Sequence, residues 1–181
     1  MPGSRAGAGP SLSVRAGTPA DAGPLAAFGA RIFAETFGPA NDPADMALYL
    51  SRTYGLAQQS RELADPAIAT LLAELDGTLV GFAQLREGQA PPCVIGPDPV
   101  ELNRFYVDRP SQGRGVAQGL MGAVLAEGRR RGGATLWLAV WERNDRAQAF
   151  YRKCGFVDVG SQPFVLGTDR QTDRVMSRPL P

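Results

Sequence analysis

Hydrophobic residues in the first third of the chain recur at helical spacing. One apolar face repeats every three or four positions, at Leu25, Phe28, Ile32 and Phe33. This period predicts an amphipathic helix that begins near Asp21 and ends at Gly38. The same pattern predicts a strand over 12–15 before this helix and two shorter helices after it, one beginning at Pro43 and one over 56–63.

From Ala67 onward the pattern changes to that of β-strands. The runs 67–75 and 78–86 flank Asp76-Gly77, a two-residue turn that predicts a β-hairpin. Further elements follow from the same criteria: strands over 100–107, 134–141, 156–166 and 174–180, and helices over 115–131 and 144–154. The run over 134–141 is almost entirely apolar, which is typical of a strand covered on both faces.

This order of elements predicts an α/β protein. We expect a mixed (α+β) sheet with helices on both faces, in which 100–141 forms a parallel β-α-β unit. Residues 12–181 are expected to form a single domain. Residues 1–11 are rich in Gly, Ala, Pro and Ser and contain no apolar segment, so we expect a disordered tail there.

Composition excludes several functional classes. The formal net charge of this 181-residue chain is +1, which offers no electrostatic basis for a nucleic-acid or membrane partner. The chain has no histidine, which removes His-dependent triads and His-ligated metal sites, and Cys93 and Cys154 do not have zinc-site spacing. We therefore expect no metal. Without a membrane-length apolar run or a secretory signal, the chain is expected to be a reduced, cytoplasmic protein.

A glycine-rich turn, Gln112–Ala117, is the most informative functional signal. It lies between a predicted strand and a predicted helix, so its backbone N–H groups and the helix dipole favour a bound phosphate. Two common phosphate motifs are excluded. Gln118 stands where the dinucleotide fingerprint requires its third glycine, and the only lysine, Lys153, lies far from the turn, unlike the lysine of the NTPase loop. A glycine-rich turn with no ligand is the alternative for this segment alone.

The turn reads Gln-x-x-Gly-x-Ala and resembles the pyrophosphate-binding motif of the Gcn5-related N-acetyltransferases (GNAT). The segment from Asn144 to Phe156 is similar to the family's second signature, Asn-x-x-Ala-x-x-Phe-Tyr-x-x-x-Gly-Phe. The resemblance implies acetyl-CoA as cosubstrate and the GNAT fold, a mostly antiparallel sheet whose strands over 100–107 and 134–141 are parallel and splay apart to admit the pantetheine. It also implies these cofactor-binding residues: Phe105, Val107, Gln112, Gly113, Arg114, Gly115, Val116, Ala117, Asn144 and Ala147.

The resemblance further implies how the thioester is handled. Tyr151 stands at the position of the family's general acid, which gives a proton to the departing thiolate. Its alternative role is half-buried packing beside Phe150. Val107 is expected to offer its backbone N–H to the thioester oxygen, at a β-bulge that the family places there. For Asn144, a role as N-cap of its own helix is compatible with cofactor contact.

Glu101 lies on the strand that precedes the glycine-rich turn. In several family members a glutamate at this spacing is the general base, so the resemblance implies that role for Glu101. Simple alternation would put Glu101, Asn103 and Phe105 on one face of the strand. A carboxylate in an apolar strand is costly unless it is solvated or paired, so the alternative is a salt bridge to an arginine such as Arg104 or Arg31.

Three further segments, 33–37, 137–144 and 171–176, resemble the PaiA-type branch of the family, described as spermidine/spermine acetyltransferases. The resemblance implies a small-molecule amine, a polyamine, as the acceptor. A polyamine site needs carboxylates or aromatic faces. The substrate-binding candidates are Glu35, Trp141 and Glu142. Their alternatives are solvated surface charges for the two glutamates and a core position for the tryptophan.

Other features bear on the acceptor class. Enzymes that acetylate protein N-termini usually carry Glu-Val-Arg where this chain has Ala139-Val140-Trp141, which counts against a peptide acceptor. The PaiA-type branch often has histidine in place of Gln162 and a second acid in place of Thr168. The functional alternatives are an acetyltransferase for protein or peptide amines and a non-catalytic acetyl-CoA-binding module. A monomer and a homodimer are both compatible with the sequence.

Overall fold

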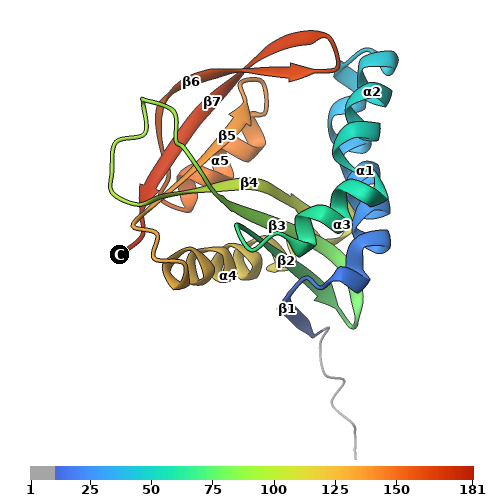
Figure 1. Cartoon of the computed structure of the whole chain (residues 1–181), viewed down its shortest axis with the longest axis horizontal. Coiled ribbons are helices and arrows are strands. Elements are labelled where there is room, and N and C mark those ends of the chain that lie inside the picture. Colours follow the sequence, from blue (N-terminus) through green and yellow to red (C-terminus); the bar gives the residue numbers. More distant parts are fainter. Residues whose placement is uncertain (1–10) are drawn as a thin grey trace, which may run out of the picture.

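The computed structural model describes residues 11–181 (Figure 1). Seven strands form one sheet in the order β1-β2-β3-β4-β5-β7-β6. The strands are β1 (Leu12–Ala16), β2 (Ile68–Leu75), β3 (Thr78–Glu87), β4 (Pro99–Val107), β5 (Thr135–Trp141), β6 (Val157–Leu166) and β7 (Asp169–Pro179). The helices are α1 (Ala22–Phe37), α2 (Pro43–Thr53), α3 (Leu56–Ala64), α4 (Val116–Arg130) and α5 (Asp145–Lys153). The tail expected over 1–11 lies outside the described residues, except for Ser11.

The sheet is antiparallel except between β4 and β5. These two strands pair only from Pro99, opposite Thr135, to Glu101, opposite Trp137. Beyond Glu101 they separate, so their facing edges carry backbone N–H and C=O groups that no neighbouring strand binds. The predicted mixed sheet, with one parallel pair that splays apart, is confirmed.

β4 contains a β-bulge, whose position differs from the prediction. Gln84 and Leu85 are consecutive in β3, but their partners in β4 are Arg104 and Leu102. Asn103 is therefore the extra residue of β4. The bulge was expected at the end of this strand, and it lies in the middle instead.

The bulge changes which residues share a face of β4. Leu102 and Phe105 both pack on the core beneath α4 and α5, although they are three positions apart and strict alternation would separate them. Glu101 lies on the other face, where its carboxylate meets Arg86 of β3. The expectation that Glu101, Asn103 and Phe105 share one face is therefore wrong for Phe105.

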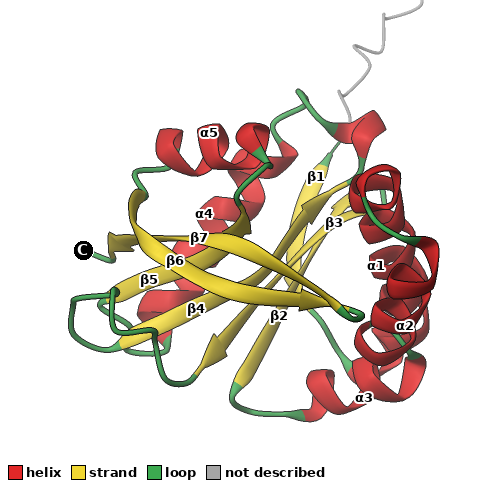
Figure 2. Cartoon of the chain, turned by 90° about the horizontal axis from the view of Figure 1, so that it is seen from above, coloured by secondary structure: helices red, strands yellow, loops and turns green. Residues whose placement is uncertain are grey.

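Helices cover both faces of the sheet, as predicted, with α1, α2 and α3 grouped away from α4 and α5 (Figure 2). On one face α4 and α5 bury Leu120, Val124 and Tyr151 against the strands. On the other face a second core forms around Phe33 and Phe82. The splayed strands β4 and β5 run between these two cores. Within residues 11–181, no helix has both the length and the apolar character needed to cross a membrane.

β7 begins earlier than the strand predicted over 174–180. Its first half is polar and lacks the apolar alternation that predicts a strand, but it pairs with the end of β6 across a tight turn. This longer hairpin brings Asp173 into the sheet. There Asp173 lies between Trp141 of β5 and Gln162 of β6.

Candidate active site

The turn between β4 and α4 adopts a backbone conformation that its glycines allow. Gly113 and Gly115 have φ angles of +77° and +81°, in the left-handed region that favours glycine. A Cβ atom on either residue would enter open space, with nothing within 4 Å. The side chain of Gln112 closes the turn, because its Nε2 donates a hydrogen bond of 3.2 Å to the carbonyl oxygen of Val107.

The backbone donors of this turn are free to bind an anion. Among the described residues, the N–H groups of Gly113, Arg114 and Gly115 donate no backbone hydrogen bond. The first N–H groups of α4, which starts at Val116, have no partner within the helix either. The positive end of the helix dipole lies beside these donors, and the space over the glycines is open. Together these features fit the pyrophosphate of a coenzyme A thioester.

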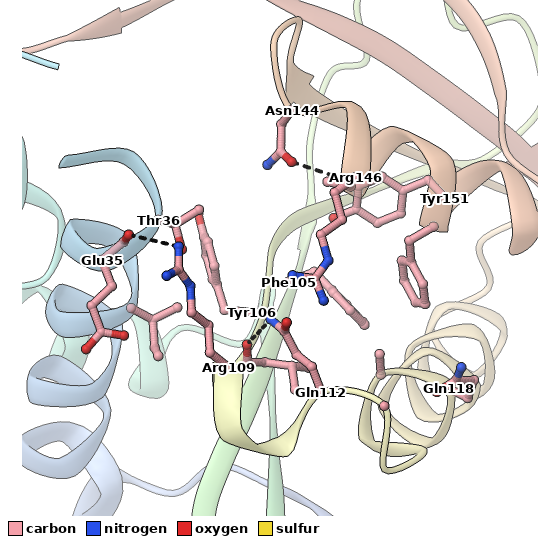
Figure 3. Close-up of a pocket in the computed structure, with 16 residues that line it drawn as sticks. Glu35, Thr36, Phe105, Tyr106, Arg109, Gln112, Gln118, Asn144, Arg146 and Tyr151 are labelled. Carbon is pink, nitrogen blue, oxygen red and sulfur yellow. Dashed lines mark hydrogen bonds between the residues drawn. The ribbon is translucent and has the colours of Figure 1, made fainter. Parts of the chain in front are cut away.

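A cleft of about 430 Å³ extends from this turn between α1, β4 and α5 (Figure 3). Most of the expected cofactor-binding residues line it: Phe105, Val107, Gln112, Gly113, Ala117, Asn144 and Ala147. Arg114, Gly115 and Val116 do not line it. Val116 is instead buried, with 1% of the residue exposed, and anchors the first turn of α4 in the core.

Two arginines that were not predicted as site residues also face the cleft. Arg109 and Arg146 line it (Figure 3), and Arg109 donates a hydrogen bond of 3.5 Å to the carbonyl oxygen of Glu35. Within the part of the chain that the structure describes, the side chain of Arg146 forms no hydrogen bond or ion pair. The guanidinium of Arg146 is therefore available to phosphate oxygens, and that of Arg109 has further N–H groups beyond its one long hydrogen bond. Local sequence does not distinguish these two residues from the other arginines of the chain.

A second, smaller cavity of about 110 Å³ adjoins the cleft. The residues that line both spaces are Phe105, Asn144, Ala147 and Tyr151. The other nine residues of the small cavity are four aromatic, three aliphatic and two polar ones: Phe33, Phe37, Trp141 and Phe164; Ala139, Val140 and Leu166; and Gln171 and Asp173. Its walls combine residues from the cores on both faces of the sheet. The small cavity therefore lies where β4 and β5 have separated.

Tyr151 stands where the cleft and the small cavity meet. Its ring centroid is 5.6 Å from that of Phe150 and 6.2 Å from that of Phe105, and 8% of the residue is exposed. Burial raises the pKa of its hydroxyl above the usual value. The phenol therefore keeps its proton at neutral pH and can donate it. Beside it, Asn144 caps α5 by accepting the N–H of Ala147 over 3.1 Å.

Glu101 lies away from both spaces. Its carboxylate accepts two hydrogen bonds from the guanidinium of Arg86, at 2.7 and 2.9 Å, and it lines neither the cleft nor the small cavity. Its distance from Phe105 along β4 is roughly 13 Å, at about 3.3 Å per strand residue. A salt bridge is thus observed for Glu101, but with Arg86 and not with Arg104 or Arg31, which pair with other carboxylates.

The residues expected to bind the acceptor lie in different places. Trp141 lines the small cavity, and its ring is 6.0 Å from that of Phe37. Glu35 lines the larger cleft instead, where its carboxylate is 3.2 Å from the guanidinium of Arg31 and 42% of its side chain is exposed. Glu142 follows Trp141 directly but lines neither space.

Asp173 was not predicted as a site residue. It lines the small cavity, and 8% of the residue is exposed. Within residues 11–181 its carboxylate forms no hydrogen bond or ion pair. Burial, and secondarily the negative charge of Glu142, raises the pKa of this carboxyl to about 6. The resemblance over 171–176 was a signal near this residue, but the polar start of β7 looks like a loop in the sequence.

Comparisons with known proteins agree with this geometry. A family model described as the acetyltransferase (GNAT) family matches residues 29–156. An uncharacterized N-acetyltransferase of Mycobacterium tuberculosis is 38% identical over 160 residues, which cover 88% of this chain and 98% of the relative. An uncharacterized N-acetyltransferase of Lactobacillus delbrueckii subsp. lactis is 34% identical over 148 residues, 82% of this chain and 86% of the relative. The crystal structure of PaiA N-acetyltransferase from Thermoplasma acidophilum in complex with coenzyme A has a similar fold, with a TM-score of 0.75 at 19% identity, over 93% of this chain and 99% of that one.

Proposed function

The chain belongs to the GNAT family and is an N-acetyltransferase that uses acetyl-CoA, and we propose that its acceptor is a primary amine of a small molecule, a polyamine. The observation that carries this proposal is the small cavity, which has aromatic walls and one carboxylate and shares Tyr151 with the cleft. Aromatic faces and carboxylates are the groups that bind an ammonium ion. The resemblance of 171–176 to the PaiA-type branch points to the same class of acceptor.

The residues around the larger cleft support binding of acetyl-CoA there. Acetyl-CoA supplies an acetyl group activated as a thioester. The free N–H groups of the glycine-rich turn would hold its pyrophosphate, and Arg109 and Arg146 would bind its phosphate oxygens. The N–H of Asp108 donates to the carbonyl oxygen of Val80 in β3. Because successive N–H groups of a strand point to opposite sides, the N–H of Val107 is directed toward the gap, where it can stabilise negative charge on the thioester oxygen.

The size of the small cavity favours a thin acceptor. A cavity of about 110 Å³ is well below the roughly 300–1,000 Å³ of a pocket that takes a drug-sized ligand. This accommodates the end of an alkylammonium chain and is small for a peptide N-terminus with its first side chain and carbonyl groups. Ala139, a small residue, forms part of the wall.

The arrangement supports direct attack in a ternary complex. Both spaces meet at Tyr151, so both substrates can be held at the same time. Neither Cys93 nor Cys154 lines either space, so within residues 11–181 no thiol is placed to carry the acetyl group between them. Tyr151 would protonate the sulfur as it leaves. An alkylammonium has a pKa near 10.4, so the acceptor must lose a proton before it attacks.

The experiment that tests this function offers the purified full chain acetyl-CoA together with spermidine, spermine, short monoamines and an N-terminal peptide panel, and follows thiol release. We expect turnover with spermidine and spermine that exceeds turnover with peptides. Robust peptide acetylation without turnover of either polyamine would overturn the acceptor class. Tight binding of acetyl-CoA by calorimetry with no turnover of any amine would make the protein a binding module.

A further inference from the structure

We propose that Asp173 is the residue that binds the ammonium group of the acceptor and removes its proton. This inference rests on the proposed function, because it names the group that the amine meets in the small cavity. Asp173 lies on β7, and in the sheet register it is flanked by Trp141 of β5 and Gln162 of β6. It lines the same cavity as Tyr151, the residue shared with the cofactor cleft.

Asp173 is buried without a partner among the described residues. With 8% of the residue exposed, its carboxylate accepts no hydrogen bond and forms no ion pair anywhere in residues 11–181. Another buried carboxylate of the chain, that of Glu62, accepts hydrogen bonds from Arg104, Gln58 and Gln84. A buried charge is costly unless it is paired. A cationic ligand in the small cavity would pair with this carboxylate and offset that cost.

The surroundings of Asp173 suit a cation. The aromatic walls, Phe37, Trp141 and Phe164 among them, can face an ammonium group. The titratable groups that interact with Asp173 or line its cavity come from four neighbouring elements: Glu142 after β5, Tyr49 on α2, Tyr106 on β4 and Tyr151 on α5. Burial raises the pKa of each of the three tyrosine hydroxyls, so these groups stay neutral at neutral pH. The negative charge of Glu142 acts on Asp173 in the same direction as burial.

Within residues 11–181, no arginine forms an ion pair with this carboxylate. Arg174, the next residue, points to Asp158 instead, with nitrogen and oxygen 2.6 Å apart. Arg143 lies over the ring of Trp141, with its guanidinium carbon 5.9 Å from the ring centroid. The raised pKa of Asp173, about 6, leaves the group mostly ionised at neutral pH and makes it a stronger base than an exposed aspartate.

Acetyl transfer exchanges the C–S bond of the thioester for an N–C bond and moves one proton from the ammonium group to water. Asp173 takes one proton from the ammonium nitrogen, and the nitrogen lone pair forms the N–C bond to the acetyl carbon. The C–S bond breaks, its electron pair goes to sulfur, and sulfur takes the proton of the Tyr151 hydroxyl. The tyrosinate takes the surplus proton of the new amide nitrogen, and Asp173 returns its proton to water. Desolvation in the cavity lowers the pKa of the ammonium and raises that of Asp173, which brings the two groups closer in proton affinity.

The decisive variant is Asp173→Asn, which keeps the shape of the side chain and cannot accept the proton. The measurements are coenzyme A affinity by calorimetry and kcat/KM for spermidine between pH 6 and pH 10. We expect unchanged coenzyme A affinity and a loss in kcat/KM of at least ~100-fold near pH 7. The deficit should shrink toward pH 10, where free amine is abundant, and Asp173→Glu should recover part of the activity.

The matched control is Asp158→Asn, because Asp158 is paired with Arg174 outside the cavity. It should keep the spermidine rate of the original chain. A loss of less than threefold in kcat/KM for Asp173→Asn, or a deficit that is the same at every pH, would overturn the role of Asp173. In that case acetylation of spermidine by the unaltered chain would still support the proposed function. Failure of the unaltered chain to acetylate any amine would overturn both.

Discussion

Replacing Asp173 by asparagine is expected to stabilise the folded protein above pH 6. The pKa of this carboxyl is raised from its ordinary value of 3.8 to about 6 in the folded state. Between these two values the folded state binds more protons than the unfolded state, so folding stability falls as pH rises through this window. The free-energy cost of holding the ionised carboxylate in the folded protein is complete above pH 6 and absent below about pH 4. Asparagine carries no charge and removes it.

The size of this free-energy cost follows from the same pKa shift. A difference of about 2 pKa units corresponds to ~3 kcal/mol at 1.36 kcal/mol per unit. Because the carboxylate faces a cavity that water can enter, we reduce this to about 2 kcal/mol. For a chain of this size, 1 kcal/mol shifts Tm by roughly 2–4 °C, so Asp173→Asn should raise Tm by about 4–8 °C at pH 8.

Thermal unfolding followed by circular dichroism, without acetyl-CoA, measures this shift at pH 8 and at pH 4.5. Asp158→Asn is a control of opposite sign. Hydrogen bonds from Arg174 lower the pKa of Asp158, so that pair stabilises the fold above the unfolded pKa and its loss should cost at most ~1 kcal/mol at pH 8. A lower Tm for Asp173→Asn at pH 8, or an equal shift at both pH values, would refute the view that Asp173 is an unpaired buried charge.

Three other substitutions test the site. Gly115→Glu should abolish coenzyme A binding in calorimetry, because it adds a side chain and a negative charge to the anion-binding turn. The control, Gly122→Glu on the exposed side of α4, should keep the affinity. Equal affinities of the two variants would refute the role of the turn. Tyr151→Phe should keep coenzyme A affinity but lower kcat by ~100-fold at saturating spermidine, and a loss of only twofold would make it a packing residue. Glu101→Gln should lower kcat/KM by less than threefold and equally at every pH, because Arg86 holds this carboxylate away from the cavity. A Glu101→Gln deficit that shrinks as pH rises would instead make Glu101 the base.

Features that depend on local sequence were predicted well. The hairpin around Asp76-Gly77 is confirmed, with φ of 49° and 78° at the two turn residues, because a two-residue turn of this type needs positive φ at both positions. The glycine-rich turn and the helix that starts at Val116 were likewise predictable, since their signals lie within a few adjacent residues. The family signature further placed Tyr151 among the site residues.

Features that depend on strand partners were not predictable in the same way. Asn103 is an extra residue only when β4 is aligned with its partner β3, so no pattern in the local sequence indicates the bulge. The polar start of β7 is held in the sheet by pairing with β6, so the strand predicted from local sequence begins only at residue 174 and does not include Asp173. The pairing of Glu101 depends on Arg86, a residue on the neighbouring strand whose register the sequence does not determine.

The cleft and the small cavity are built largely by different parts of the chain. The residues that would bind acetyl-CoA are therefore mostly not those that would select the acceptor. The cofactor cleft takes most of its wall from β4, the glycine-rich turn, α4 and α5, whereas the small cavity adds residues from β5, β6 and β7. Tyr151 belongs to both because β4 and β5 separate beside it. Substitutions on β6 and β7 can therefore change which amine is accepted without disturbing the anion-binding turn. Phe164 of β6 is such a position, because it lines the small cavity and not the cofactor cleft. Asp173 of β7 is another, and under the proposed function its carboxylate, which forms no ion pair within residues 11–181, would bind a cationic acceptor.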